Sequence, residues 1–319
     1  MPPHIPVLPE EVLHYLAVRP GGRYVDCTAG AGGHAGLIAE RMDGGALLAL
    51  DRDPSAVALA GERLKPFSGA KVVLANYVDL AAVLEAEAFG APDGILIDAG
   101  CSSMQLDQRD RGFSFEGDGP LDMRMNPETG LSAAEWLAGT PREELEQALR
   151  DYGDVKPARR IAAAIHERAA RGTLNRTQDL IAAVKEALPF VNDTPAEVRT
   201  VFQAVRIAVN DELRGLQQGV AAAAEALAPG GRLVVISFHS GEDRVVKNAL
   251  RDASRPQRER SADGRDRAVR PATMRLLTRQ PVLAGDDELR ANPRAASAKL
   301  RAAEKSAGAS GGKGAGDEE

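Results

Sequence analysis

The sequence predicts an α/β fold in which a parallel sheet is covered by helices on both faces and is interrupted by a helical insertion. Short apolar runs alternate with amphipathic stretches of helical length over residues 20–100, as in strands joined by crossover helices. Four of these runs end in acidic or polar residues. From about residue 106 to residue 198, features typical of helices replace the alternation.

The first apolar run ends in Asp26, and a glycine-dense turn and a helical stretch to Met42 follow it. Glycine lets a ligand approach backbone amides closely and tolerates positive φ. The helix after such a turn points its positive end at the ligand. Because strand, turn and helix occur in this order, we expect Gly30, Gly32 and Gly33 to form part of a nucleoside-type cofactor site, rather than only a tight connection.

The second and third apolar runs also end in side chains that suit a nucleoside. Residues 46–50 lead to Asp51, and an acid at this position can accept hydrogen bonds from both hydroxyls of a ribose. A helix is expected over residues 54–64, since proline is favoured at the first helical position. Residues 71–75 then lead to Tyr77, whose ring suits an adenine and the edge of the core equally.

The fourth apolar run, 94–97, follows a helical stretch over residues 80–87 and leads to Asp98 and a loop of small polar groups. The glycine turn also satisfies the dinucleotide fingerprint, so a nicotinamide-dependent dehydrogenase is a competing interpretation. A carboxylate at Asp26, however, would oppose a pyrophosphate and suits the ammonium or sulfonium of S-adenosylmethionine. We therefore favour S-adenosylmethionine as the cofactor, with its methyl group beside the loop after Asp98.

Residues 106–198 contain several helix starts and no convincing strand, which predicts a helical domain inserted into the sheet domain. Its opening loop over residues 109–125 mixes arginines with aromatic residues and methionines. That mixture suits RNA and equally a hinge packed on its own domain. The local features are two expected capping boxes and two amphipathic stretches, namely Ser132 with Glu135, Thr140 with Glu143, 158–170 and 177–188.

The helical period returns over residues 197–227 and stops at Pro229. A fifth apolar strand over residues 232–238 then delivers a polar cluster that begins at His239 to the same edge of the sheet. His239 is expected either to position or accept a proton, or to be structural at the start of a helix capped by Ser240.

Composition restricts the class of protein. The chain has 319 residues and a net charge of −6, so binding to nucleic acid would need a local basic patch. The arginine-rich stretch 251–275 is one candidate, although a solvated loop has the same composition. No apolar run approaches ~18 residues and the amino terminus lacks a secretion signal, which predicts a cytoplasmic protein without a membrane partner. Two cysteines, Cys27 and Cys101, exclude a disulfide framework, and no metal site is expected.

The chain also resembles the RsmH (MraW) family of bacterial ribosomal RNA small-subunit methyltransferases over nearly its whole length. The motifs that carry the resemblance are together far more specific than a glycine turn. They are HIPVL (4–8), GGH (32–34), DRDP (51–54), SSMQLD (102–107), RGFSF (111–115), GPLDMRM (119–125), FQAVRI (202–207), FHSGEDR (238–244) and NPR (292–294).

The resemblance implies a class I S-adenosylmethionine-dependent methyltransferase with a Rossmann-like parallel sheet and an inserted helical domain. It implies N4-methylation of a cytidine in the decoding region of 16S rRNA, with that RNA or the small ribosomal subunit as partner. Tyr77 replaces the usual phenylalanine and keeps the ring, while Cys27, Ala99, Cys101 and Gly241 depart from the family pattern in ways that concern packing. By resemblance, the cofactor contacts are Gly32, Gly33, His34, Asp51, Tyr77, Asp98 and Gln105.

The cytidine amine is a weak nucleophile, so acceptors that hold it in line with the methyl group would supply most of the catalysis. Asp98 and Ser102 are the candidate acceptors, and His239 is a candidate positioning or proton-accepting group. The alternative is a non-catalytic RNA-binding assembly factor that holds S-adenosylmethionine. The chain is expected to be a monomer or a homodimer. Its expected parts are methyltransferase segments 1–105 and 199–302, a substrate-recognition insertion 106–198 and a disordered tail 303–319.

Overall fold

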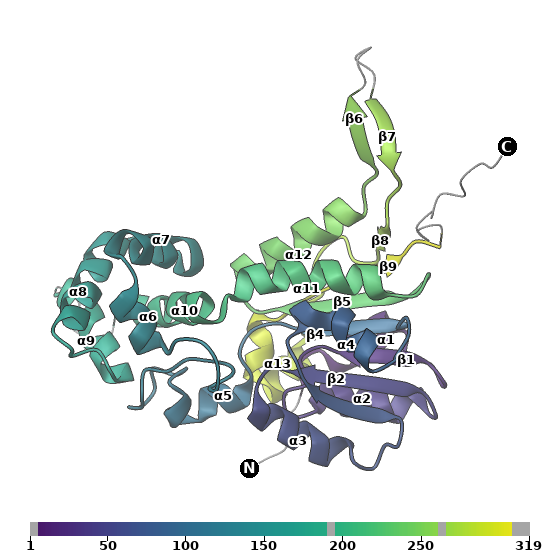
Figure 1. The fold of residues 1–319 in the computed structure, drawn as a ribbon, viewed down its shortest axis with the longest axis horizontal. Helices are drawn as coiled ribbons and strands as arrows, with labels where there is room; N and C mark the ends of the chain where they lie inside the picture. The colour runs from purple at the N-terminus through teal and green to yellow at the C-terminus, as the bar shows by residue number, and fades with distance from the viewer. Residues whose placement is uncertain (1–5, 190–194, 261–265, 308–319) are drawn as a thin grey trace. The chain divides into compact units, whose positions relative to one another are not determined.

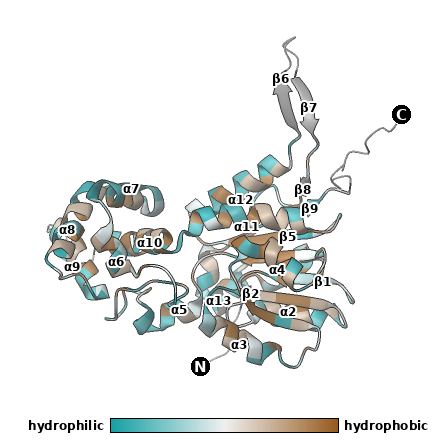
Figure 2. Cartoon of the chain, in the orientation of Figure 1, coloured by the Kyte–Doolittle hydropathy of each residue, from teal (hydrophilic) through white to brown (hydrophobic). Residues whose placement is uncertain are grey.

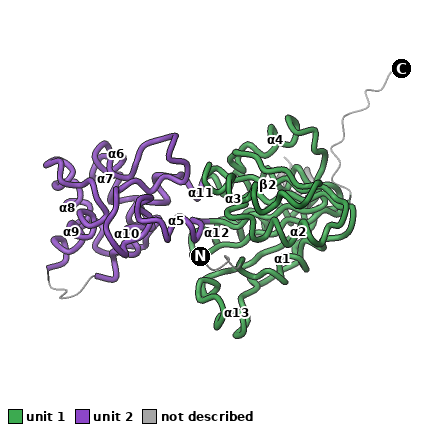
Figure 3. The backbone as a smooth tube through the Cα atoms, turned by 90° about the horizontal axis from the view of Figure 1, so that it is seen from below, with its two compact units in different colours: residues 1–99, 215–319 green, residues 100–214 purple. Residues whose placement is uncertain are grey.

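The computed structural model describes residues 6–189, 195–260 and 266–307, with the side chains of 257–270 outside that description. The chain forms two compact units, coloured separately in Figure 3. Unit 1 contains residues 1–99 and 215–319, and unit 2 contains residues 100–214. Unit 2 is longer than the insertion expected over residues 106–198, because it starts directly after the fourth strand and also takes in the helix that follows residue 196.

Unit 1 is built on a seven-stranded sheet with the order β3-β2-β1-β4-β5-β9-β8 (Figure 1). Strands β1 to β5 are parallel, as their alternation with helices predicts. Strands β9 and β8 continue the sheet in antiparallel fashion. The seven strands are β1 (Arg23–Asp26), β2 (Ala46–Asp51), β3 (Ala70–Leu74), β4 (Gly94–Asp98), β5 (Arg232–Ser237), β8 (Met274–Leu276) and β9 (Lys299–Lys305).

Helices cover both faces of this sheet, because successive strand residues point to opposite sides. In β4, Leu96 belongs to one core with α1, α2 and α3, whereas Ile95 and Ile97 belong to the other core with α4, α11 and α12. Figure 2 shows hydrophobic residues along the strands. The helices are α1 (Pro9–Leu16), α2 (Gly33–Met42), α3 (Pro54–Leu64), α4 (Leu80–Ala86), α11 (Glu212–Ala226), α12 (Ser240–Ala253) and α13 (Asp286–Ala291), with 3-10 turns at Tyr77–Asp79 and Pro293–Ser297.

The strands after residue 238 were not predicted from the sequence. Strand β9 runs to Lys305, so the expected tail from residue 303 begins too early. Strand β9 lacks the β-branched residues typical of strands. It forms because its residues 299–304 pair with the whole length of β5. A separate two-stranded antiparallel sheet pairs β6 (Gln257–Arg260) with β7 (Asp266–Arg270).

Unit 2 is helical, as predicted, with one hydrophobic core that includes Leu137, Leu149, Ile165 and Val184. Helix α10 packs on this core through Val201 and its neighbours, so it belongs to unit 2. The helices are α5 (Ser103–Asp107), α6 (Ala133–Gly139), α7 (Arg142–Gly153), α8 (Ala158–Ala170), α9 (Thr177–Ala187) and α10 (Glu197–Asn210), with a 3-10 turn at Arg109–Arg111.

One of the two capping boxes expected in unit 2 is confirmed. Ser132 accepts a hydrogen bond from the Glu135 N–H, and the Glu135 side chain accepts one from the Ser132 N–H. The prediction of a capping box at Thr140 is wrong, since the Thr140 hydroxyl donates back to the Trp136 carbonyl at 2.6 Å. That hydroxyl therefore closes α6 rather than opening α7, and Pro141 is the N-cap of α7.

The helix expected over residues 197–227 is two helices. Helix α10 ends at Asn210, and Asp211 adopts a left-handed conformation with φ 51. Helix α11 begins at Glu212. The apolar period continues across the break, which is why periodicity alone did not reveal it.

Within the described ranges, none of the helices is both long enough and apolar enough to cross a membrane.

Candidate active site

The carboxyl ends of the parallel strands bring most of the candidate residues of unit 1 to one edge of the sheet. Asp26, Asp51 and Asp98 are the last residues of β1, β2 and β4. Tyr77 follows β3, and His239 follows β5. This common placement is the one predicted from the sequence, because ligand sites of open α/β sheets lie at this edge.

The glycine turn between β1 and α2 needs glycine for its own backbone. Gly30 has φ +53 and Gly32, the N-cap of α2, has φ +77, in the left-handed region that favours glycine. Space is also limited at Gly33, where an added Cβ would lie 3.3 Å from Cβ of Pro6. The turn therefore has the form that close approach to a ligand requires, and ligand contacts of Gly32 and Gly33 stay predictions.

Asp51 ties the glycine turn to the end of β2. Its Oδ2 accepts from the Gly30 N–H at 2.8 Å, and its Oδ1 accepts from the Asp53 N–H at 2.9 Å. Burial raises the pKa of the Asp51 carboxyl, and these two backbone donors oppose that rise. Each carboxylate oxygen can accept more than one hydrogen bond, so the Asp51 carboxylate keeps acceptor capacity for a ribose.

Tyr77 lies against α11 within unit 1. A Cβ added to Gly219 would fall 2.3 Å from the Tyr77 ring, so the ring lies directly on the helix backbone at that glycine. Tyr77 also packs at the margin of the core formed with α4, α11 and α12. The edge-of-core interpretation is thus realised, and contact with an adenine stays a prediction.

Asp26 is almost fully buried, with 1% of its surface exposed. Its Oδ1 accepts from the Thr28 N–H at 3.0 Å. Its Oδ2 is buried and has no hydrogen-bond partner within the described part of the chain. Burial is the main cause that raises the pKa of Asp26 to about 7, and the charge of Asp51 adds to the rise.

Asp98 lies on the neighbouring strand in a similar state. Its backbone N–H donates to the Thr28 hydroxyl at 2.7 Å. Its Oδ1 is buried and accepts no hydrogen bond from any residue that the structure describes. Burial raises the pKa of Asp98 to about 8, with further contributions from the charges of Asp26 and Glu242. Two acids with raised pKa values and unpartnered oxygens therefore share one edge.

His34, near the start of α2, is the histidine beside Asp98. It is 6% exposed, and its Nε2 lies 3.8 Å from Oδ2 of Asp98. That separation is too long for a hydrogen bond, so the imidazole lines the acidic edge without bonding to the Asp98 carboxylate.

His239 is the N-cap of α12, a position that the sequence interpretation had given to Ser240. Its Nδ1 accepts from the Glu242 N–H at 3.4 Å, and Oε2 of Glu242 accepts from the Phe238 N–H at 2.7 Å. The second ring nitrogen, Nε2, lies 3.2 Å from Oε1 of Glu242. With Nδ1 as acceptor, the neutral ring carries its hydrogen on Nε2. The arrangement therefore favours the structural interpretation of His239.

Ser102 and Gln105 belong to unit 2, where they form a capping box on α5. The Ser102 hydroxyl accepts from the Gln105 N–H at 3.2 Å, and the Gln105 side chain accepts from the Ser102 N–H at 3.1 Å. Gln105 is buried. Their contacts with an amine and a cofactor stay predictions.

The two cysteines have different surroundings. Cys27 follows β1 and is buried, and burial raises its pKa well above the ordinary value. Cys101 in unit 2 accepts a hydrogen bond from Nη1 of Arg206, with Sγ at 3.0 Å. Neither is in a disulfide. In the described ranges, no group of three or more His, Cys, Asp or Glu residues is arranged to hold a metal ion.

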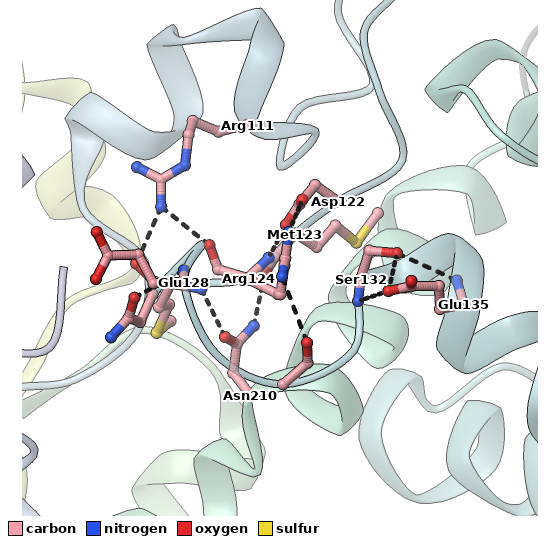
Figure 4. A network of polar contacts seen from close by, with 11 residues as sticks. Arg111, Asp122, Met123, Arg124, Glu128, Ser132, Glu135 and Asn210 are labelled. Atoms are coloured by element: carbon pink, nitrogen blue, oxygen red, sulfur yellow. Dashed lines mark hydrogen bonds and ion pairs between the residues drawn. The ribbon is translucent and has the colours of Figure 1, made fainter. Parts of the chain in front are cut away.

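Two of the three arginines in the loop over residues 109–125, Arg111 and Arg124, bond to the loop itself (Figure 4). Nη2 of Arg111 donates to the carbonyls of Arg124 and Met125, each at 2.9 Å. The Arg124 guanidinium pairs with both carboxylate oxygens of Asp122 at 2.9 and 2.6 Å. Of the two interpretations of this loop, the structure favours the segment packed on its own unit, because these arginines are already engaged.

Asn210 at the end of α10 fixes the same loop from the other side (Figure 4). Its side chain donates to the Met123 carbonyl and accepts from the Met125 N–H, both at 2.7 Å. Met123 is fully buried and has φ 59, a strained conformation for a non-glycine residue. Such strain persists only where surrounding contacts impose it, and Asn210 supplies two of those contacts.

The arginine-rich stretch 251–275 lies largely outside the described part of the chain. Residues 261–265 and the side chains of 257–270 are not described, so its role as a basic patch stays a prediction.

Sequence reasoning placed Glu242 only in a polar cluster and missed its structural part. It is 1% exposed and accepts a hydrogen bond from the N–H of Phe238, directly after β5. The indication was the spacing from His239 to Glu242, which is that of a capping box. Likewise, the sequence indicated Arg206 only as part of the FQAVRI motif (202–207).

Comparison with known proteins links nearly the whole chain to one group. The sequence matches the model of the MraW methylase family over residues 1–306. A ribosomal RNA small subunit methyltransferase H from Heliobacterium modesticaldum is 46% identical over 95% of this chain and 98% of its own. Its namesake from Methylococcus capsulatus is 49% identical over 93% and 99%. Among solved structures, an rRNA methylase from Streptococcus thermophilus aligns with 96% of this chain and 99% of its own, with 11% identity and a TM-score of 0.43.

Proposed function

Because the chain belongs to the MraW methylase family, we propose that it methylates N4 of a cytidine in the decoding region of 16S rRNA, with S-adenosylmethionine as methyl donor. The observation that carries the proposal is the extent of the similarity. The match covers residues 1–306, and the sheet edge, glycine turn and helical insertion all lie within it.

The acidic sheet edge fits a cationic cofactor. Buried polar atoms normally have hydrogen-bond partners, yet Oδ2 of Asp26 and Oδ1 of Asp98 have none within the described residues. A cofactor with ammonium and sulfonium groups supplies the positive charge that these oxygens lack. The dinucleotide interpretation fits less well, since a pyrophosphate would add negative charge beside Asp26.

The cofactor-binding residues follow from this edge. Asp51 would accept the ribose hydroxyls, and Tyr77 would lie against the adenine. Gly32 is the N-cap of α2, and Gly33 and His34 are its first residues. They would contact the ligand at the positive amino end of this helix. Gln105 enters the proposal as a cofactor contact through the resemblance of its motif alone.

The chain contributes position and charge to the reaction. When bound, S-adenosylmethionine supplies an electrophilic methyl group. The Asp98 carboxylate would accept a hydrogen bond from the cytidine amine and hold its nitrogen in line with that group. A positioned acceptor also stabilises the positive charge that develops on the nitrogen. Ser102 is the second proposed acceptor.

A methyl-transfer assay tests the function. The purified chain is incubated with labelled S-adenosylmethionine and small subunits from a strain that lacks this methylation, and nucleosides are then separated by mass. Label in N4-methylcytidine is expected. Label in another nucleoside would contradict the proposed substrate, and binding of cofactor and subunit without transfer would favour a non-catalytic assembly factor.

Replacing Asp51 with alanine should weaken S-adenosylmethionine binding at least ~10-fold, because charge-assisted hydrogen bonds contribute about 1.5–3 kcal/mol each. The affinity of Asp51→Asn should lie between those of the wild type and Asp51→Ala, since asparagine keeps one acceptor oxygen. Titration calorimetry measures both affinities. Asp79→Ala, at an exposed acid of the same unit, is the control. Unchanged affinity in Asp51→Ala would contradict the ribose assignment.

Replacing His239 with alanine should lower the free energy of unfolding by about 1 kcal/mol through loss of the helix cap. Methyl transfer should stay within a few-fold of wild type. His239→Asn should recover most of the stability, because asparagine is a good N-cap. Urea denaturation and the transfer assay measure the two effects. If both variants lost about 100-fold or more in rate while folded, His239 would be a general base instead.

A further inference from the structure

Asp26 and Asp98 lie on the same face of the sheet at its ligand edge. Strands β1 and β4 are parallel neighbours, with Asp26 in register with Leu96. Residues two apart on a strand point to the same side, so Asp98 shares the face of Leu96 and Asp26. The Thr28 backbone and side chain bond to both residues, which ties the two strand ends together.

The charges that shift the pair most come from other acids. The charged groups that act on Asp98 are Asp26 and Glu242, both acidic, and Asp51 acts on Asp26. His34 faces Asp98 at 3.8 Å. Two ionised carboxyls in a buried site repel each other and lose hydration, so one of them retains a proton at little cost.

We propose that Asp26 and Asp98 act as a proton-linked charge sensor, which holds a proton in the absence of a cation and releases it to solvent when a cationic cofactor binds. The inference rests on the proposed function, because it takes S-adenosylmethionine as the ligand. No covalent bond changes in this step. One O–H bond of the carboxyl pair breaks, the electron pair stays on the oxygen, and the proton passes to the buffer.

The sensor distinguishes ligands by charge. S-adenosylmethionine carries both a sulfonium and an ammonium group, whereas the product S-adenosylhomocysteine keeps only the ammonium. Methylthioadenosine keeps the adenosine and the sulfur with neither charge. Proton release should therefore decrease in this order, and the product should be held less tightly than the substrate at neutral pH.

The sign of the pH dependence follows from the raised pKa values, about 7 for Asp26 and about 8 for Asp98. Above them the pair is ionised and a cationic cofactor binds without releasing a proton. Below them each binding event must remove a proton, so affinity falls as pH decreases from about 8 towards 6, by at most about tenfold per pH unit for each proton released. Asp26→Asn should weaken this dependence, because Asp98 loses the charge of Asp26 but stays buried.

Titration calorimetry of the full chain at about pH 7 in two buffers of different ionisation enthalpy tests the sensor. The binding enthalpy of S-adenosylmethionine should differ between phosphate and Tris, corresponding to release of up to about one proton. Methylthioadenosine should give the same enthalpy in both buffers. The titrations with S-adenosylmethionine and methylthioadenosine use the unmodified protein, so they do not depend on the folding of any variant.

Two variants complete the test. Asp26→Asn should lose the part of the buffer dependence that depends on the charge of Asp26, while the part that comes from burial of Asp98 remains. Asp79→Asn, the same substitution at an exposed acid of unit 1, should retain all of it. Binding of S-adenosylmethionine with equal enthalpies in both buffers would overturn the sensor and leave the proposed function standing. Full proton release in Asp26→Asn would overturn the role of the pair. Absence of any binding would remove the cofactor assignment and this inference with it.

Discussion

Replacing Asp98 with asparagine is expected to slow methyl transfer about 100-fold or more. Asparagine keeps the shape of the side chain but removes its charge and presents an NH2 group where the amine needs an acceptor. Asp98 ends β4 with a buried, unpartnered Oδ1, the geometry of a side chain kept for a ligand. The loss should appear in kcat more than in cofactor affinity, because the contact with the amine is strongest in the transition state.

Single-turnover assays on undermethylated small subunits measure this effect, and calorimetry measures cofactor binding by the same variant. Asp79→Asn is the matched control, since Asp79 is exposed and lies on the same unit. A variant that binds the cofactor and transfers methyl within a few-fold of wild type would exclude Asp98 as the main acceptor. The acceptor would then have to be sought at Ser102.

Local pattern predicted the parallel half of unit 1 because its elements are encoded locally. An apolar run that ends in Asp26, Asp51 or Asp98 identifies both a buried strand and its ligand end. Pro54 and Leu64 bound α3 as expected, since proline and periodicity are local features. The placement of five strand ends at one edge then follows from parallel topology.

The antiparallel edge and the helix break could not be predicted in this way. Strand β9 depends on pairing with β5, whose residues lie 62 to 72 positions earlier in the chain. The break at Asp211 depends on a left-handed backbone at one aspartate, a conformation that aspartate adopts only occasionally. In both cases tertiary contacts decide the structure, and the residues themselves carry little local preference.

In the candidate site, too, local features could be predicted and features that depend on tertiary contacts could not. Sequence placed Asp51, Tyr77 and Asp98 correctly at the edge, because each follows a recognisable strand. It did not reveal that Asp26 and Asp98 share a face with unpartnered oxygens, which depends on the register of β1 against β4. Nor did it decide the part played by His239, which depends on the ring nitrogen that faces the Glu242 backbone.

Replacing Arg206 with methionine is expected to destabilise unit 2 by about 3–5 kcal/mol. Arg206 forms a bidentate pair with Glu212 at 2.8 and 2.9 Å, and the two side chains are only 14% and 6% exposed. Its third contact is with Sγ of Cys101. Methionine fills similar space but leaves the Glu212 carboxylate buried without its partner, and the cost of that uncompensated charge dominates.

The only tryptophan of the chain, Trp136, packs against the core of unit 2 and reports its unfolding. Urea denaturation followed by its fluorescence should therefore show an earlier transition in Arg206→Met. The double variant Arg206→Met with Glu212→Leu should recover most of the loss, since no buried charge then lacks a partner. Arg214→Met is the control, because Arg214 is 74% exposed in its pair with Asp211 and surface pairs contribute about 0–1 kcal/mol. If Arg206→Met cost no more than Arg214→Met, the buried pair would not stabilise unit 2.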